Sequence, residues 1–361
     1  MKLRHVFDPR NNALNAWRLV LATGVIAWHS FPLTGRHVPF GAGHQFLSQV
    51  FVDGFFAISG FLITSSWLKN PRLRQYSVAR GLRIFPGLWV CVAVTAFVIA
   101  PLSVAIQGGS VAKLMLSGEP LRYVLNNGLL NFLYAGIAGT PRHVPFPGAW
   151  NGSIWTLLPE LFCYVAVAAF GMSGLLRHRW LLLALTALML VCSVLVTPWT
   201  RFIEIWTPAW IGTRFALMFL AGALLQQYQD VIPARWSLVA ASAGLVVMST
   251  WLPNYRVLGA LPLAYAIIVS GALLRDRRLR LRNDVSYGVY IYAFPTQQLL
   301  IVCGLGVLPP LLFFPVAALA TLPLAALSWF LIEKHAISLK SRFLPRRAPE
   351  LDPSTASATD G

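Results

Sequence analysis

Long apolar stretches separated by short polar segments dominate the pattern of hydrophobic and polar positions along the chain. A transmembrane helix needs about 20 apolar residues, because each backbone polar group in the hydrocarbon must be paired within the segment. The pattern predicts ten such helices, at residues 14–31, 48–68, 86–106, 151–172, 180–196, 209–228, 237–252, 258–274, 284–306 and 310–332. We therefore expect an all-α, polytopic membrane protein with about ten transmembrane helices.

The composition excludes a soluble fold. Of the 361 residues, 57% are hydrophobic and 11% are charged, whereas soluble globular domains have about 25% charged residues. The formal net charge of +17 would favour nucleic-acid binding in a soluble chain. Membrane topology is the better explanation here, so the expected partner is the lipid bilayer and not a nucleic acid.

The distribution of Lys and Arg predicts the orientation of the chain. An even number of helices places both termini on the same side of the membrane. If that side is the cytoplasm, 22 of the 29 basic residues are cytoplasmic, six lie on the opposite side, and Arg214 lies within a helix. Positive charge concentrates on the cytoplasmic side of membrane proteins, so we expect both termini in the cytoplasm.

The segments between and after the helices predict the domain organisation. Residues 107–150 contain several Gly and Pro residues and are expected to form a long external loop with room for a short helix. No cleavable signal pattern precedes the first helix. Residues 1–340 are expected to form one transmembrane domain, and the polar Pro/Ser/Thr-rich residues 341–361 a disordered cytoplasmic tail.

Arg18 and His29 are an unusual pair for a transmembrane helix. Eleven residues correspond to about 1100° of rotation, which is about 20° from whole turns, and to roughly 16 Å along the helix axis. Both side chains are therefore expected to face the same interior cavity, where His29 would suit proton abstraction. The alternative is a buried histidine paired with a backbone carbonyl and an arginine that serves only topology.

Arg80 and Arg83 are three residues apart and share a helix face at the predicted cytoplasmic end of the third helix. Two guanidinium groups in this position could bind phosphate groups bidentately. The alternative is positive-inside anchoring.

Glu160 is a carboxylate within a predicted helix, in a segment that also contains Asn151, Trp155 and Tyr164. Ionisable groups in such segments are costly and mark functional sites by default. They predict a polar pocket entered from the outer side of the membrane. The alternative is a structural ion pair between Glu160 and Arg214.

A metal site is not expected from the sequence. The four cysteines, Cys91, Cys163, Cys192 and Cys303, have no paired spacing, and His29, His37 and His44 do not share a helix face. The motifs of soluble hydrolases, nucleotide-binding proteins and zinc proteases are also absent.

Taken together, these residues resemble the acyltransferase-3 family of integral-membrane O-acyltransferases, over residues 11–340. Seven segments carry the resemblance, through Arg18 and His29; Asp53, Ser59 and Gly60; Arg80, Arg83 and Pro86; Trp155, Leu157 and Glu160; Arg214, Phe219 and Gly222; Ser286, Tyr287 and Gly288; and Glu333 and Lys334. Three positions depart from the family pattern. Asn15 stands where aspartate is common, Ala293 where many members have histidine, and His335 where proline is usual.

The resemblance implies an acyl-CoA donor, usually acetyl-CoA, as a co-substrate and not as a permanently bound cofactor. Arg80 and Arg83 would then hold the phosphate groups of the donor, and Arg18 would contact the donor or hold a carboxylate that orients His29. His29 would act as a general base or as a transient acyl carrier, and both routes stay open.

The acceptor implied by the resemblance is a hydroxyl of a carbohydrate or glycoconjugate, because family members modify polysaccharides, lipopolysaccharide and Nod factors. The bacterial inner membrane is the expected location. Asp53 and Glu160 join His29 as catalytic candidates, and Asn151, Trp155 and Arg214 are candidates for binding the acceptor. The alternative function is a transporter or flippase of a lipid-linked saccharide, which predicts repeated halves; the sequence contains no such repeat.

Overall fold

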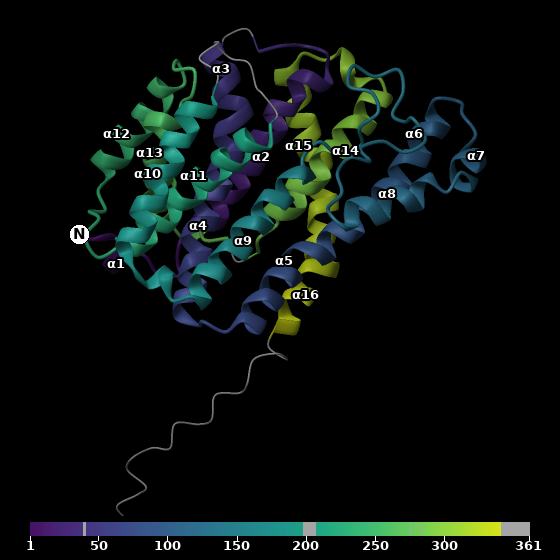
Figure 1. Cartoon of the computed structure of the whole chain (residues 1–361). Helices are drawn as coiled ribbons and strands as arrows, with labels where there is room; N and C mark the ends of the chain where they lie inside the picture. Colours follow the sequence, from purple (N-terminus) through teal and green to yellow (C-terminus); the bar gives the residue numbers. More distant parts are fainter. Residues whose placement is uncertain (39–40, 198–206, 275, 282, 341–361) are drawn as a thin grey trace, which may run out of the picture.

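The computed structural model describes residues 1–38, 41–197, 207–274, 276–281 and 283–340 (Figure 1). Within these residues the chain forms helices and no β-strand, which confirms the predicted all-α class. The predicted tail, residues 341–361, lies outside the described residues. The α-helices are α1 (Leu3–Val6), α2 (Leu14–Leu33), α3 (Gly41–Gln45), α4 (Phe51–Lys69), α5 (Leu73–Val94), α6 (Ala100–Ile106), α7 (Val111–Leu116), α8 (Glu119–Gly128), α9 (Leu157–Met172), α10 (Arg179–Val196), α11 (Pro208–Gln227), α12 (Trp236–Ser249), α13 (Arg256–Leu273), α14 (Ser286–Val302), α15 (Pro310–Leu327) and α16 (Lys334–Ser338).

Each of the ten predicted apolar runs coincides with a helix. Among the described residues, seven helical segments are long and apolar enough to cross a membrane, and they are Gly41–Lys69, Leu73–Ile106, Ile154–Met172, Arg179–Val196, Pro208–Gln227, Arg256–Leu273 and Pro310–Ser338. The other three helices are α2, α12 and α14. The chain is therefore a multi-pass membrane protein, and the number of ten transmembrane helices stays a prediction.

Short π-helical segments join consecutive α-helices into three longer continuous helices. Phe46–Val50, Thr95–Ile99 and Ser328–Glu333 join α3 to α4, α5 to α6 and α15 to α16. The continuous helix Leu73–Ile106 has 34 residues, about 50 Å at 1.5 Å per residue, whereas a bilayer core measures about 30 Å. The helix is therefore longer than the hydrocarbon core, and its N-terminal part, which carries Arg80 and Arg83, can lie beyond the core at one end of the bundle.

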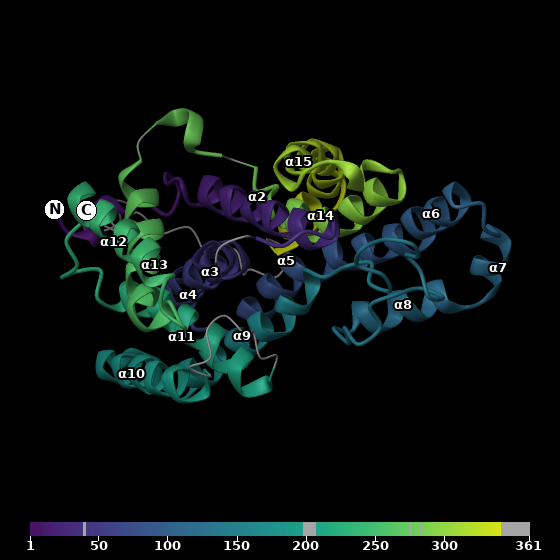
Figure 2. The ribbon, with the colours of Figure 1, turned by 90° about the horizontal axis from the view of Figure 1, so that it is seen from above.

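The predicted loop at residues 107–150 contains two short helices, α7 and α8, where the sequence suggested one. Both views show the segment from α6 to α8 extending away from the other helices (Figures 1 and 2). The loop returns to the bundle at Trp150, which is fully buried.

The core of the bundle is formed by α4, α11, α13 and α14, whereas α10 is largely exposed. Two glycines bring α4 and α11 into backbone contact. A Cβ at Gly60 would lie 1.8 Å from the carbonyl oxygen of Phe219, and a Cβ at Gly222 would lie 1.9 Å from that of Ala57. Small residues allow such close packing in membranes, and here they fix the helix that carries Asp53 and Ser59.

Candidate active site

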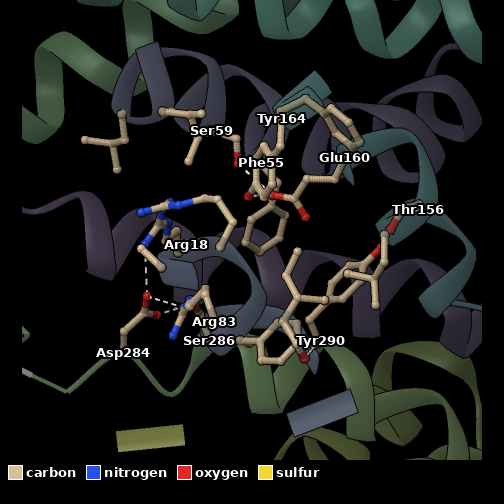
Figure 3. A pocket seen from close by; sticks show the side chains of 18 of the residues that line it. Arg18, Phe55, Ser59, Arg83, Thr156, Glu160, Tyr164, Asp284, Ser286 and Tyr290 are labelled. Carbon is tan, nitrogen blue, oxygen red and sulfur yellow. Dashed lines mark hydrogen bonds and ion pairs between the residues drawn. The ribbon is translucent and has the colours of Figure 1, made fainter. Parts of the chain in front are cut away.

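A charged hollow lies at the end of the bundle where α5 begins and α16 ends. It measures about 430 Å³ and is lined by α2, α4, α5, α9, α14 and the last helix (Figure 3). Its charged lining residues are Arg18, Arg80, Arg83, Glu160, Asp284 and Lys340. We call it the charged cavity. It unites three predicted donor-binding arginines from two helices.

Asp284 joins two of these arginines. Its Oδ2 lies 2.9 Å from Nη1 of Arg18 and 2.6 Å from Nη2 of Arg83, and both side chains point toward it in Figure 3. Burial alone would raise the pKa of Asp284, but the charges of Arg83 and Arg18 outweigh it and lower the pKa to about 2. Arg83 also lies 3.6 Å from a carboxylate oxygen of Glu333. Arg18 and Arg83 are therefore already compensated by carboxylates.

Arg80 has a different environment. In the part of the chain that the structure describes, no carboxylate lies within ion-pair distance of Arg80 or Lys340, and the buried Nε of Arg80 has no hydrogen-bond partner. The guanidinium lies 6.0 Å from the centre of the Tyr164 ring. Burial and the nearby charge of Arg80 lower the pKa of Lys340. Two uncompensated cations in one cavity favour an anionic ligand.

Glu160 lies on another wall of the charged cavity. Its Oε1 accepts hydrogen bonds from Ser59 Oγ at 2.9 Å and from Tyr164 Oη at 2.5 Å. Glu160 shares this cavity with Arg80 and Lys340, which the sequence assigns to the cytoplasmic side, so the two predictions about the side of entry disagree with each other. Glu160 lies in the first turn of α9, and this position directs its side chain into the charged cavity.

His29 lies in a second cavity of about 220 Å³, which we call the histidine cavity. The buried Nδ1 of His29 has no hydrogen-bond partner among the described residues. Its ring packs edge-to-face on Phe294, with centroids 5.0 Å apart. Gln297 on α14 donates to the carbonyl of Ile26 and to Ser30 Oγ, both at 3.1 Å. These bonds fix the turn of α2 that presents His29.

Three residues line both cavities and separate them: Val52, Thr156 and Tyr290. We call them the partition. Oγ1 of Thr156 and Oη of Tyr290 are 2.7 Å apart, and Figure 3 shows both across the charged cavity from Asp284. The prediction that Arg18 and His29 face one cavity is wrong. Their separation along α2 carries them to different depths, on opposite sides of the partition.

Asp53 is fully buried and lines neither cavity. Its carboxylate accepts hydrogen bonds from Arg214 Nε at 2.8 Å, Arg256 Nε at 2.6 Å and Tyr255 Oη at 2.5 Å. The alternative ion pair between Glu160 and Arg214 is therefore wrong. Arg214 extends from this cluster to the wall of the histidine cavity.

The two remaining candidates, Asn151 and Trp155, have different environments. Asn151 donates to the carbonyl of Ile291 at 2.8 Å and accepts from the backbone N–H of Ser153 at 3.0 Å, so it fixes the turn before α9. Trp155 lines the histidine cavity and lies 5.6 Å from the ring of Phe215. Within the described residues, no group of three or more His, Cys, Asp or Glu side chains is placed to hold a metal ion.

Several site residues were not predicted from the sequence. Asp284 and Lys340 stand at helix boundaries, where charged residues are usually solvent-exposed. Arg256 is one of the six basic residues expected on the outer side of the membrane, yet it is only 2% exposed. Asp284 lies two residues before Ser286, and Ser286 donates to it. The spacing of Asp284 and Ser286 at the start of α14 is the local sequence feature that could have indicated this carboxylate.

Comparisons with known proteins show similarity to an acyltransferase family and to two relatives. The sequence model of the family described as "Acyltransferase domain" matches residues 11–330. The chain is 28% identical to a protein named "O-acetyl transferase" from Shigella phage Sf6, over 95% of this chain and 98% of the relative. It is also 28% identical to "Nodulation protein 10" from Rhizobium leguminosarum bv. viciae, over 95% of this chain and 97% of the relative. No solved structure matches the chain.

Proposed function

Because this chain belongs to the acyltransferase family that matches residues 11–330, we propose that it transfers an acetyl group from acetyl-CoA to a hydroxyl of a carbohydrate or glycoconjugate. The observation that carries the proposal is the arrangement of the two cavities. A cationic cavity adjoins a cavity that contains a histidine, and only the partition separates them. A polyanionic thioester and a neutral hydroxyl compound need two such compartments.

The donor occupies the charged cavity in this proposal. Arg80 and Lys340, which lack carboxylate partners in the described chain, bind its phosphate groups by charge-assisted hydrogen bonds. Arg18 and Arg83 line the same cavity, oriented by Asp284. The pantetheine arm then directs the thioester toward the partition and His29.

The acceptor occupies the histidine cavity. His29 removes the proton from the acceptor hydroxyl, the oxygen forms a bond to the thioester carbonyl carbon, and the carbon–sulfur bond breaks. The sulfur leaves as the CoA thiolate and takes up a proton. In the alternative route an imidazole nitrogen of His29 first accepts the acyl group and then passes it to the hydroxyl.

A carbohydrate acceptor agrees with the residues around His29. Trp28, Trp155 and Phe146 line the same cavity, and aromatic faces provide apolar area beside polar groups. The name of one relative, an O-acetyl transferase, also supports transfer of an acetyl group to a hydroxyl oxygen.

The proposed location is the bacterial inner membrane, with both termini in the cytoplasm. This orientation would open the charged cavity toward the compartment that contains acyl-CoA. It rests on the distribution of the 29 basic residues.

The test uses purified protein in lipid nanodiscs with labelled acetyl-CoA and surface glycans extracted from a bacterium that lacks this gene. We expect the label in alkali-labile esters on the glycan, with release of one CoA thiol per ester. If reconstituted vesicles instead move a lipid-linked saccharide across the bilayer and form no ester, the flippase alternative replaces the proposal.

A further inference from the structure

The partition between the two cavities consists of Val52 from α4, Thr156 from the turn before α9, and Tyr290 from α14. We propose that these three residues select the acyl group by size, so that acetyl passes and longer acyl chains are rejected. This inference rests on the proposed function, because it assigns the donor thioester to the charged cavity and the acceptor to the histidine cavity.

The polar side of the partition is held in place by several hydrogen bonds. Oγ1 of Thr156 and Oη of Tyr290 are 2.7 Å apart, and each lies 3.1 Å from the carbonyl oxygen of Ser153, so one hydroxyl donates to the other and the second donates to this carbonyl. Both side chains are buried, with exposures of 5% and 7%. Rotation of either side chain would leave buried polar groups unpaired, which is costly. This side of the partition therefore resists widening.

The apolar side of the partition is fixed through its helix. Val52 directly precedes Asp53 on α4. The carboxylate of Asp53 accepts hydrogen bonds from Arg214 of α11 and Arg256 of α13, and these bonds hold this part of α4 in place. The glycine contact between α4 and α11 lies two turns further along. A β-branched side chain also has few rotamers in a helix. Val52 cannot easily move away from Thr156 and Tyr290.

A fixed opening discriminates by chain length. His29 and the thioester must meet across the partition, so the acyl group has to enter the space between Val52, Thr156 and Tyr290. An acetyl group adds only a methyl beyond the carbonyl carbon, whereas a butyryl group adds two further methylene groups. In a packed apolar site, each methylene changes discrimination by about 10-fold or more.

The experiment supplies wild-type protein with an equimolar mixture of acetyl-CoA, propionyl-CoA and butyryl-CoA, and mass spectrometry measures the ratio of butyryl to acetyl esters on the glycan. Val52→Ala and Thr156→Ser remove methyl groups from opposite sides of the partition, and the serine retains the hydroxyl that contacts Tyr290. We expect each substitution to raise the ratio by about 10-fold. The matched control is Val50→Ala, at a buried valine that lines neither cavity, and it should leave the ratio unchanged.

A third variant tests the same wall in the opposite direction. Val52→Phe should reduce acetyl transfer, whereas the affinity for free CoA, measured by calorimetry, should remain that of the wild type because the phosphate groups bind elsewhere. If the wild type transfers acyl groups but neither small substitution changes the ratio, the size selection is refuted and the proposed function stands. If the wild type transfers none of the three acyl groups, the proposed function fails, and the inference fails with it.

Discussion

Arg80 and Arg83 lie one turn apart on α5 and line the same cavity, yet only Arg83 is ion-paired within the described chain. Arg83 contacts Asp284 and Glu333, whereas the buried Nε of Arg80 has no partner. The two arginines of one motif therefore have different tasks. Arg83 orders the cavity, and Arg80 is available to a ligand.

The first prediction separates these tasks. Arg80→Ala should weaken CoA binding by about 10–100-fold, since a hydrogen bond to a charged group contributes about 1.5–3 kcal/mol, with little change in Tm. Arg83→Ala should instead lower Tm, because it leaves the buried Glu333 without its cation and Asp284 with Arg18 alone. Calorimetry with CoA and thermal unfolding in detergent measure the two effects, and Arg74→Ala, at an exposed position on α5, is the control. If Arg80→Ala binds CoA with the wild-type affinity, Arg80 does not bind the donor, and the alternative role in positive-inside anchoring applies.

The second prediction concerns His29. His29→Ala and His29→Gln should each reduce acyl transfer by about 10²–10⁴-fold, the usual effect of losing a general base, while Tm stays close to that of the wild type. His37→Ala removes an exposed histidine near the same end of α2 and should retain full activity. Intact-mass measurement after rapid quenching distinguishes the routes, because an acyl carrier adds one acyl mass to the wild-type protein. A Gln variant with most of the wild-type activity would make His29 structural.

The third prediction concerns Asp53. Asp53→Asn should destabilise the protein by about 3–5 kcal/mol, because it leaves Arg214 and Arg256 buried without their carboxylate. Thermal unfolding measures the loss. A variant with the wild-type Tm and no acyl transfer would instead support the catalytic role predicted from the sequence.

The fourth prediction concerns pH. The folded-state pKa of Asp284, about 2, lies below its ordinary value of 3.8, so the ionised carboxylate stabilises the folded protein above pH 3.8 and the effect is lost as the pH falls through about 2. With Glu333→Gln introduced into both proteins so that this neighbouring carboxyl does not titrate, the difference in Tm caused by Asp284→Asn should therefore be constant from pH 5 to pH 8 and smaller at pH 3. Asp276→Asn, at an exposed carboxylate, should show no such dependence. A difference that already shrinks between pH 7 and pH 5 would contradict the lowered pKa.

The fifth prediction tests the glycine contact between α4 and α11. Gly60→Ala should destabilise the protein by about 3 kcal/mol, the upper end for overpacking, because the new methyl group meets backbone atoms that cannot rotate away. Gly212→Ala places the same methyl group on α11 with no atom within 4 Å and should be neutral or slightly stabilising. Similar Tm values for the two variants would show that the helices can separate.

The positions of the helices were predictable from the sequence, because burial in hydrocarbon leaves a one-dimensional signal about 20 residues long. The composition of the charged cavity was predictable in part. Arg18, Arg80 and Arg83 were selected as ionisable groups in or beside apolar runs, and they do share one cavity.

Pairings between distant residues were not predictable in this way. Arg18 and Asp284 are 266 residues apart, and no periodicity within one helix reports such a contact. The separation of His29 from Arg18 by the partition was missed for the same reason. The periodicity of one helix predicts the direction in which a side chain points, but the side chains of the neighbouring helices determine where a cavity ends.

The close approach of α4 and α11 at Gly60 and Gly222 limits how the protein can move during a catalytic cycle. Since α4 and α11 meet through their backbones, they behave as one rigid body that includes Val52 and the Asp53 cluster. Opening of the histidine cavity to admit or release a bulky acceptor must therefore come from the other walls, which are α2, α14, the loop at Phe146 and the turn before α9. Acceptor exchange then becomes a displacement of those elements against a stationary α4 and α11.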